Sequence, residues 1–118
     1  MRVKYAIAFV SDMQRAVAFY RDVIGLPLKF ESDGWTEFAT EGATLALHVA
    51  EGSTSHELDQ HRAPGSWGSG ISVPDLDAFH SRMIKNKVRC LQEPRETFGA
   101  RIAQYLDPDG LVISVGED

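Results

Sequence analysis

The sequence has a single cysteine and no long apolar run. These two features argue against a disulfide-stabilised protein and against a membrane-spanning one. Cys90 is the only cysteine among 118 residues, so no disulfide can form within the chain. No apolar stretch approaches the roughly 20 residues that cross a bilayer. The charges of Arg2, Lys4 and Asp12 also interrupt any apolar signal-peptide segment. We therefore expect a soluble, cytoplasmic protein that does not associate with membranes.

The sequence also lacks a long cluster of basic residues. The net charge is −5, and no basic cluster is longer than residues 85–87, Lys-Asn-Lys. Nucleic-acid-binding domains concentrate lysine and arginine on one face, so nucleic acid is not expected as a partner. A hydrophobic content of 43% and a charged content of 25% are ordinary for a globular chain of one domain.

A helix between two strands organises the first half of the chain. Residues 9–26 read FVSDMQRAVAFYRDVIGL, in which apolar residues recur at helical spacing. Ser11 or Asp12 can cap the N-terminus, and Gly25 suits a left-handed C-cap. The pattern predicts a helix over residues 12–24.

Strand-like segments surround this helix, and the same order returns in the second half. The predicted strands of the first half cover residues 3–10, 27–32, 35–40 and 43–50. In the second half, strands are predicted at residues 69–73, 88–92, 95–98, 101–106 and 111–115, with a helix at 75–87. We predict one α+β domain over residues 1–118, with βαβββ modules at 1–50 and 68–118 and a polar linker at 51–67.

Two matches support an internal repeat. Residues 10–13, Val-Ser-Asp-Met, correspond to residues 73–76, Val-Pro-Asp-Leu, 63 positions later. The apolar positions of residues 45–49 correspond to those of residues 111–115 at an offset of 66. Before the last strand, the Asp-Pro-Asp-Gly sequence at 107–110 predicts a tight turn.

With its early VSDMQRAVAFYRDVIGL segment and its late Asp-Pro-Asp-Gly turn, the chain resembles the vicinal oxygen chelate superfamily. This is the glyoxalase, bleomycin-resistance and dioxygenase group. The resemblance implies two tandem βαβββ modules that form an incomplete barrel-like sheet, with the helices outside and a ligand in the cleft between the modules. It also implies a homodimer, because many small members of the group are homodimers.

The resemblance further implies four positions at which metal-using members hold their ion. Here they carry Tyr5, His48, Gly68 and Ser114. Only His48 is a good ligand for a divalent metal, since Gly68 has no side chain and Tyr5 would have to lose a proton of pKa ~10. We therefore expect no metal at these positions and no cofactor.

Two other groups of reactive residues have simpler explanations. His56 and His61 lie in the polar linker, which is typical of a solvated loop rather than of a metal site. Cys90 has no histidine beside it in sequence and is most simply a small buried hydrophobic residue.

The residues expected to bind a ligand lie on predicted strands. They are Tyr5, Ile7, Phe9, Trp35, Phe38, His48, Arg101, Tyr105 and Ser114, with Glu37 as a further candidate at the rim. Strand alternation places Tyr5, Ile7 and Phe9 on one face. Core packing explains Trp35 and Phe38 equally well, and the sequence leaves open which faces of residues 35–38 and 101–105 line the cleft.

Three functions are compatible with these residues. The one we favour is metal-free binding of a small organic molecule, as the resemblance to the bleomycin-resistance branch implies. The second is an enzyme of lyase, isomerase or dioxygenase type, which either depends on a metal or uses His48 and Tyr5 as acid and base. The third is a regulatory module that binds another protein. We rank it last, because the sequence has no apolar surface stretch or charged tail that would indicate a protein partner.

Overall fold

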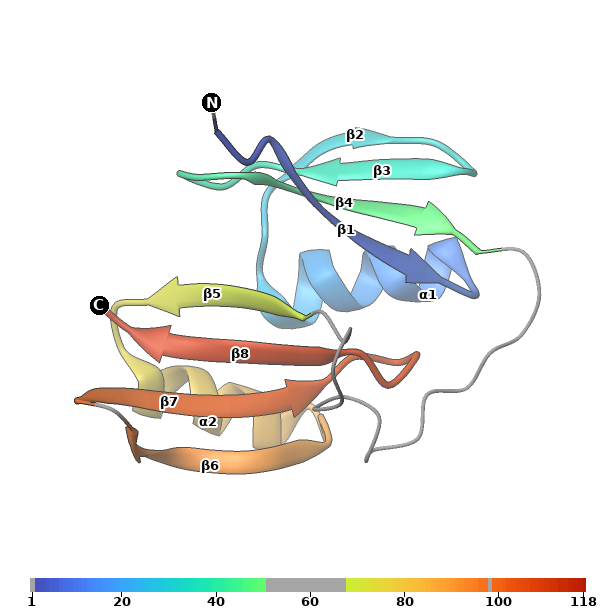
Figure 1. Cartoon of the computed structure of the whole chain (residues 1–118). Helices are drawn as coiled ribbons and strands as arrows, with labels where there is room; N and C mark the ends of the chain where they lie inside the picture. Colours follow the sequence, from blue (N-terminus) through green and yellow to red (C-terminus); the bar gives the residue numbers. More distant parts are fainter. Residues whose placement is uncertain (1, 51–67, 98) are drawn as a thin grey trace. The chain divides into compact units, whose positions relative to one another are not determined.

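The computed structural model describes residues 2–50, 68–97 and 99–118, which fall into two units (Figure 1). Unit 1 comprises residues 1–54 and unit 2 comprises residues 55–118. Unit 1 contains β1 (Tyr5–Val10), α1 (Met13–Ala18), its π-helical continuation η1 (Phe19–Ile24), β2 (Leu28–Glu31), β3 (Trp35–Phe38) and β4 (Thr44–Val49). Unit 2 contains β5 (Ser69–Val73), α2 (Leu76–Lys85), β6 (Cys90–Thr97), β7 (Ala100–Leu106) and β8 (Val112–Glu117). The predicted α+β fold with two βαβββ modules is confirmed.

The two sheets have the same topology. Their strand orders are β1-β4-β3-β2 and β5-β8-β7-β6. In each sheet the first and last strands of the unit pair in parallel, and the remaining neighbours are antiparallel. The helix covers one face of its own sheet in each unit (Figure 1). The opposite face of each sheet is therefore not covered by that helix.

Both helices begin at an aspartate N-cap. Asp12 Oδ1 accepts a hydrogen bond from the Arg15 amide at 3.1 Å, and Asp75 Oδ1 accepts one from the Ala78 amide at 3.0 Å. Of the two candidate caps of the first helix, Asp12 is therefore the cap. At the other end of this helix, Gly25 adopts a φ of 96°, as expected for a left-handed C-cap.

One predicted pair of strands is wrong. Residues 88–92 and 95–98 were expected as separate strands, but the single strand β6, Cys90–Thr97, spans most of both and includes Pro94. The register of β6 against β7 shifts twice, between Cys90 and Gln92 and between Gln92 and Arg95. Proline is tolerated because β6 lies at the edge of its sheet, where one side of the strand has no neighbour within unit 2.

The core of unit 1 lies between α1 and the sheet. Val10, Val17, Thr36, Phe38 and Leu47 are each no more than 2% exposed. Thr36 Oγ1 lies 3.3 Å from the Met13 sulfur, and the Tyr20 and Phe38 ring centroids are 6.1 Å apart. These contacts identify the helix-facing side of β3.

Within the described residues, no helix is long and apolar enough to cross a membrane.

The Asp-Pro-Asp-Gly turn owes its shape to one buried carboxylate. Asp107 is 5% exposed, and its Oδ1 accepts the amides of Asp109 and Leu111, each at 2.9 Å. Gly110 completes the turn at a φ of 85°, which only glycine adopts readily. The predicted turn is therefore a scaffold for the start of β8.

Replacing Asp107 with alanine should lower the free energy of unfolding by about 2 kcal/mol, because two partly buried amides lose a charged acceptor. Asp107→Asn should cost less, since the amide oxygen can still accept. Urea unfolding followed by circular dichroism measures both. Equal stability of Asp107→Ala and the unsubstituted chain would contradict this role.

Candidate functional site

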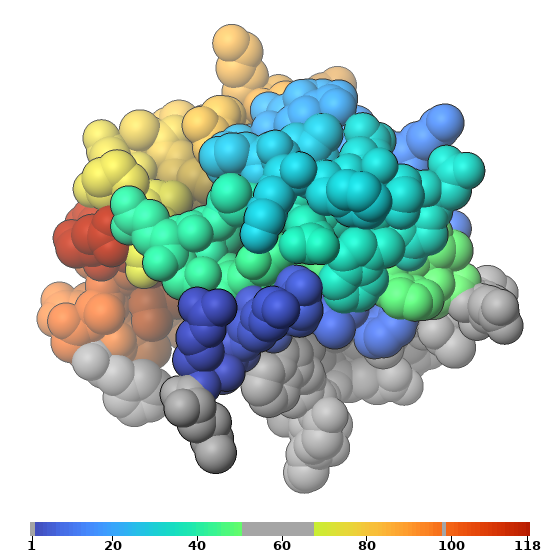
Figure 2. Space-filling model, turned by 90° about the horizontal axis from the view of Figure 1, so that it is seen from above, coloured from blue at the N-terminus to red at the C-terminus, as the bar shows by residue number. Residues whose placement is uncertain are grey.

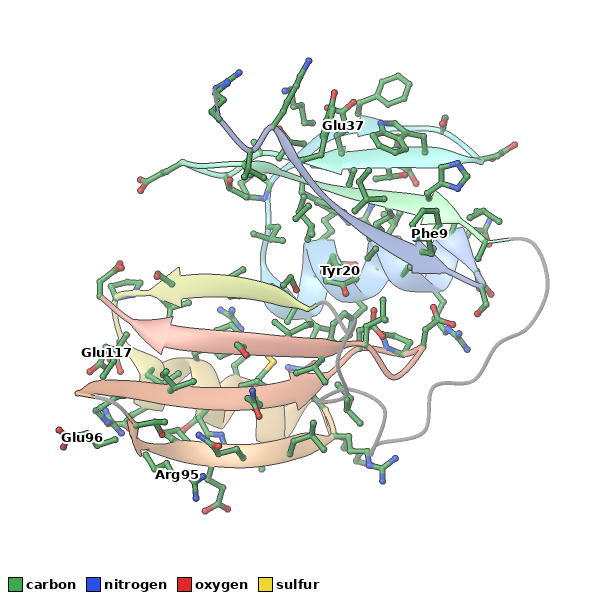
Figure 3. The ribbon with its side chains drawn as sticks, viewed as in Figure 1. Phe9, Tyr20, Glu37, Arg95, Glu96 and Glu117 are labelled. Carbon is green, nitrogen blue, oxygen red and sulfur yellow. The ribbon has the colours of Figure 1, made fainter. Side chains whose placement is uncertain are left out.

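The sheet of unit 1 has two faces of different chemistry. Thr36 and Phe38 face α1, so alternation puts Trp35 and Glu37 of the same strand on the other side. Figure 3 shows Glu37 on the side of the sheet away from α1, whereas Tyr20 belongs to the helix side. Register and ring contacts place further residues with them. We call this surface the open face; it includes Tyr5, Ile7, Phe9, Phe30, Trp35, Glu37, Ala46 and His48.

Three strands bring aromatic rings together on the open face. Phe9 of β1 lies opposite His48 of β4, which in turn lies opposite Trp35 of β3. The ring centroids are 5.3 Å apart for Phe9 and His48 and 6.0 Å apart for Trp35 and His48. Tyr5 adds a fourth ring, with its centroid 5.6 Å from that of Trp35 in an edge-to-face arrangement. Figure 2 looks onto this side of unit 1, where atoms of its strands lie at the surface.

Part of this cluster is accessible to solvent. Phe9 is 58% exposed and Ile7 is 41% exposed, although both are large apolar side chains. Phe30 of β2, on the same face, is 51% exposed. Unit 1 thus presents an apolar and aromatic surface of the kind that binds flat organic molecules.

Glu37 is the acidic group of the open face. Its Oε2 accepts a hydrogen bond of 2.9 Å from Trp35 Nε1, which fixes the indole relative to the carboxylate. Lys29 Nζ lies 3.8 Å from Oε1, beyond hydrogen-bonding distance. The Glu37 side chain is 18% exposed, whereas that of Lys29 is 56% exposed. The ion pair with Lys29 is therefore a weak, solvent-screened contact.

The tautomer of His48 follows from its backbone contact. Nδ1 lies 2.7 Å from the Val49 carbonyl oxygen, which can only accept a hydrogen bond. Nδ1 therefore carries a hydrogen, and in the neutral ring Nε2 is left as an acceptor. His48 is exposed, so Nε2 is available to a molecule on the open face.

Three of the expected ligand-binding residues lie on the helix-facing sides of the sheets instead. Phe38 and Tyr105 are fully buried, and the Tyr105 hydroxyl lies 2.8 Å from His80 Nδ1 on α2. Arg101 forms an ion pair of 2.8 Å with Asp77 of α2. Burial raises the pKa of the Tyr105 phenol, with a smaller contribution from Cys90, so the hydroxyl stays protonated at neutral pH. Each of these three residues contacts the helical segment of its own unit, and none is part of the open face.

Ser114 lies on the sheet of unit 2, on the side away from α2. Its Oγ accepts a hydrogen bond of 3.1 Å from Gln104 Nε2. Gly70 lies opposite Ser114 on β5, and Gln92 lies opposite Gln104 on β6. This face of unit 2 carries amides, a hydroxyl and glycine where unit 1 carries aromatic rings.

The sheet register corrects one equivalence between the two modules. Ile7 lies opposite Ala46, and Gly70, 63 residues after Ile7, lies opposite Ser114. Ser114 therefore corresponds to Ala46, 68 residues earlier, and not to His48 as the offset of 66 predicted. The extra residues belong to the hairpin of β6 and β7, which is longer than that of β2 and β3.

With this correction the four metal positions that the resemblance implies carry Tyr5, Ala46, Gly68 and Ser114. Alanine and glycine have no donor atom, and serine and tyrosine are poor ligands while they keep their protons. A β-carbon at position 68 would lie 3.2 Å from the Val112 carbonyl oxygen, so a larger residue fits there only if the backbone moves. This donor set does not fit a divalent metal. Among the described residues, no three or more histidine, cysteine, aspartate or glutamate side chains form a group suited to a metal.

The histidines of the predicted linker and the single cysteine were also considered from the sequence, and neither adds a described residue to the open face. His56 and His61 lie outside the described residues. Burial raises the pKa of the Cys90 thiol, outweighing a hydrogen bond from the Gln92 backbone that lowers it. A protonated thiol is a poor nucleophile, which agrees with a structural role for Cys90.

Sequence reasoning missed the contribution of β2 to the open face. Strict alternation would place Leu28 and Phe30 on one face, but the register shifts between them. Leu28 therefore lies opposite Phe38, and Phe30 lies opposite Glu37. No residue of the segment signals this bulge, so only the pairing reveals that Phe30 joins the open face.

Comparisons with known proteins agree with this architecture. The sequence profile of the Glyoxalase/Bleomycin resistance protein/Dioxygenase superfamily matches residues 2–115. A protein of unknown function from Agrobacterium tumefaciens has a crystal structure with a TM-score of 0.79 and 28% identity, covering 100% of this chain and 94% of that one. TnmS3, an antibiotic binding protein from Streptomyces sp. CB03234, has a TM-score of 0.74 and 28% identity, covering 99% and 95%. The metallothiol transferase FosB of Lysinibacillus sphaericus is 24% identical over 109 residues, covering 92% of this chain and 76% of FosB.

Proposed function

The chain belongs to the glyoxalase/bleomycin resistance protein/dioxygenase superfamily, and we propose that within it the protein binds a small organic molecule on the open face of unit 1, without a metal ion. The observation that carries this proposal is the cluster of four rings, those of Tyr5, Phe9, Trp35 and His48, on three neighbouring strands. Aromatic side chains favour stacked or edge-to-face contacts with flat ligands. The similarity to an antibiotic binding protein, TnmS3, supports the same function.

A thermal-shift screen tests this proposal. The panel should contain planar aromatic compounds of one to three rings together with aliphatic compounds of similar mass. We expect stabilisation by aromatic members only, because only they can stack on Trp35 and Phe9. A ligand at 100 times its dissociation constant should add about 2.7 kcal/mol to the free energy of unfolding. A screen in which no aromatic compound stabilises the protein would contradict the proposal.

An enzyme of the same fold is the second candidate, favoured by one observation. The Val49 carbonyl holds Nδ1 of His48 and leaves Nε2 free to take a proton. Among the described residues, however, no hydrogen bond joins the Tyr5 hydroxyl to His48, as an acid/base pair would require. Mass spectrometry of a bound compound after long incubation separates the two candidates: an unchanged compound supports binding, and a changed mass that requires His48 supports catalysis.

We also propose that the protein forms a homodimer through unit 1 or through the sheet edges. Each sheet ends in strands whose outer backbone groups have no partner within their own unit. Unpaired strand edges and exposed apolar side chains such as Val3, 71% exposed, favour association. Light scattering coupled to size exclusion should give twice the chain mass of 13.1 kDa. A single-chain mass at micromolar concentration would contradict the dimer.

A further inference from the structure

Around Trp35 and His48, the polar atoms that the open face presents to a ligand are mostly acceptors. The side-chain N–H of Trp35 is already donated to Glu37 at 2.9 Å. The Nδ1 hydrogen of His48 is already donated to the Val49 carbonyl at 2.7 Å. What remains is a carboxylate oxygen of Glu37, Nε2 of the His48 ring, and the hydroxyl of Tyr5, which can donate or accept.

Glu37 is short of hydrogen-bond donors for a carboxylate with so little contact with solvent. Its side chain is 18% exposed and lies on β3 between Ala46 on one side and Phe30 on the other, neither of which donates. Lys29 approaches Oε1 only to 3.8 Å. A carboxylate removed from water is costly unless its oxygens accept hydrogen bonds. Oε1 therefore has room for a stronger donor than Lys29.

The residues next to Glu37 add little bulk beside its carboxylate on the β4 side. The neighbour on β4 is Ala46, whose side chain is small and fully buried. The ring of Trp35 lies beside the carboxylate and is held there by its own N–H. A flat ring stacked near Trp35 would carry its substituents toward Oε1.

We infer that the ligand of the open face is a planar aromatic compound bearing N–H donors, of the amidine or aromatic amine class, whose N–H groups bind Glu37 Oε1. This inference rests on the proposed binding function and names the ligand's chemistry. An aromatic carboxylate would place like charges together, and a hydrocarbon ring would leave Oε1 without a donor. Both should bind more weakly than the amidine.

A matched pair of probes tests the inference by titration calorimetry. Naphthalene-2-carboxamidine and 2-naphthoate share one ring system and differ in donors and charge. We expect the amidine to bind the unsubstituted protein at least tenfold more tightly than the carboxylate. Glu37→Gln should weaken amidine binding at least tenfold and leave naphthoate binding equal or improved. Glutamine keeps an oxygen that can accept from Trp35 Nε1, so it is the conservative variant.

The outcomes separate this inference from the proposed function. Equal affinities of the two probes for the unsubstituted protein would overturn the inference and leave ring binding intact. Unchanged amidine affinity in Glu37→Gln would do the same. If neither probe nor uncharged 2-naphthamide binds, the proposed function and the inference both fail. The comparison on the unsubstituted protein requires no variant, so it holds even if Glu37→Gln folds poorly.

Discussion

Phe38→Ala should lower the free energy of unfolding by about 3–5 kcal/mol, the usual cost of emptying a buried aromatic site. Phe38 is fully buried and lies opposite Leu45 of β4, with its ring 6.1 Å from that of Tyr20. The cavity would lie between the helix and the sheet, where neighbouring strands restrict collapse. Chemical unfolding monitored by circular dichroism measures the loss.

The matched control is Trp35→Ala, three positions earlier on the same strand. Trp35 lies on the open face and is half-buried, so its removal should cost about 1 kcal/mol or less of stability. If Trp35→Ala costs as much stability as Phe38→Ala, the assignment of the two faces of β3 is wrong.

Trp35→Ala should instead have its large effect on binding. We expect affinity for an aromatic ligand to fall by about 30-fold or more, in the range of a tryptophan hot spot. The ring contacts both Tyr5 and His48, so its loss removes the centre of the cluster. Trp35→Phe should retain most of the affinity, because phenylalanine preserves a stacking surface. Titration calorimetry with the best compound from the thermal-shift screen measures these changes.

Ile84→Ala provides the control for this binding experiment. Ile84 is a large apolar residue, 52% exposed, on α2 of unit 2. Its removal takes away exposed apolar surface without touching the open face. Equal losses of affinity in Trp35→Ala and Ile84→Ala would mean that binding is non-specific.

The fold could be predicted because its signals are local. Asp12 and Asp75 cap their helices through contacts only three residues long, and Gly25 and Gly110 stand where positive φ is required. Such contacts depend on neighbouring residues in the chain and so appear in the sequence. The repeat of Val-x-Asp before each helix follows from the same contacts.

The candidate site was harder to predict because it depends on pairing between distant strands. The sequence placed Tyr5, Ile7 and Phe9 on one face and His48 toward the ligand, and the register puts these residues on one face of unit 1. It left the face of Trp35 open, and only the pairing with β4 shows that Trp35 joins them. A periodicity of two cannot say which face of a strand meets its helix, so Phe38, Arg101 and Tyr105 were expected in the cleft but face the helices. Bulges in β2 and β6 changed the register, which no single-strand pattern records.

The most direct test of the account is the indole N–H signal of Trp35 in a nitrogen–proton correlation spectrum during ligand titration. The chain has two tryptophans, and Trp35→Phe assigns the signals by removing one of them. The account predicts that the Trp35 indole signal and the amides of β1, β3 and β4 shift with the ligand, while the amides of α2 stay in place. Ligand-dependent shifts confined to unit 2, with the Trp35 indole unchanged, would contradict it.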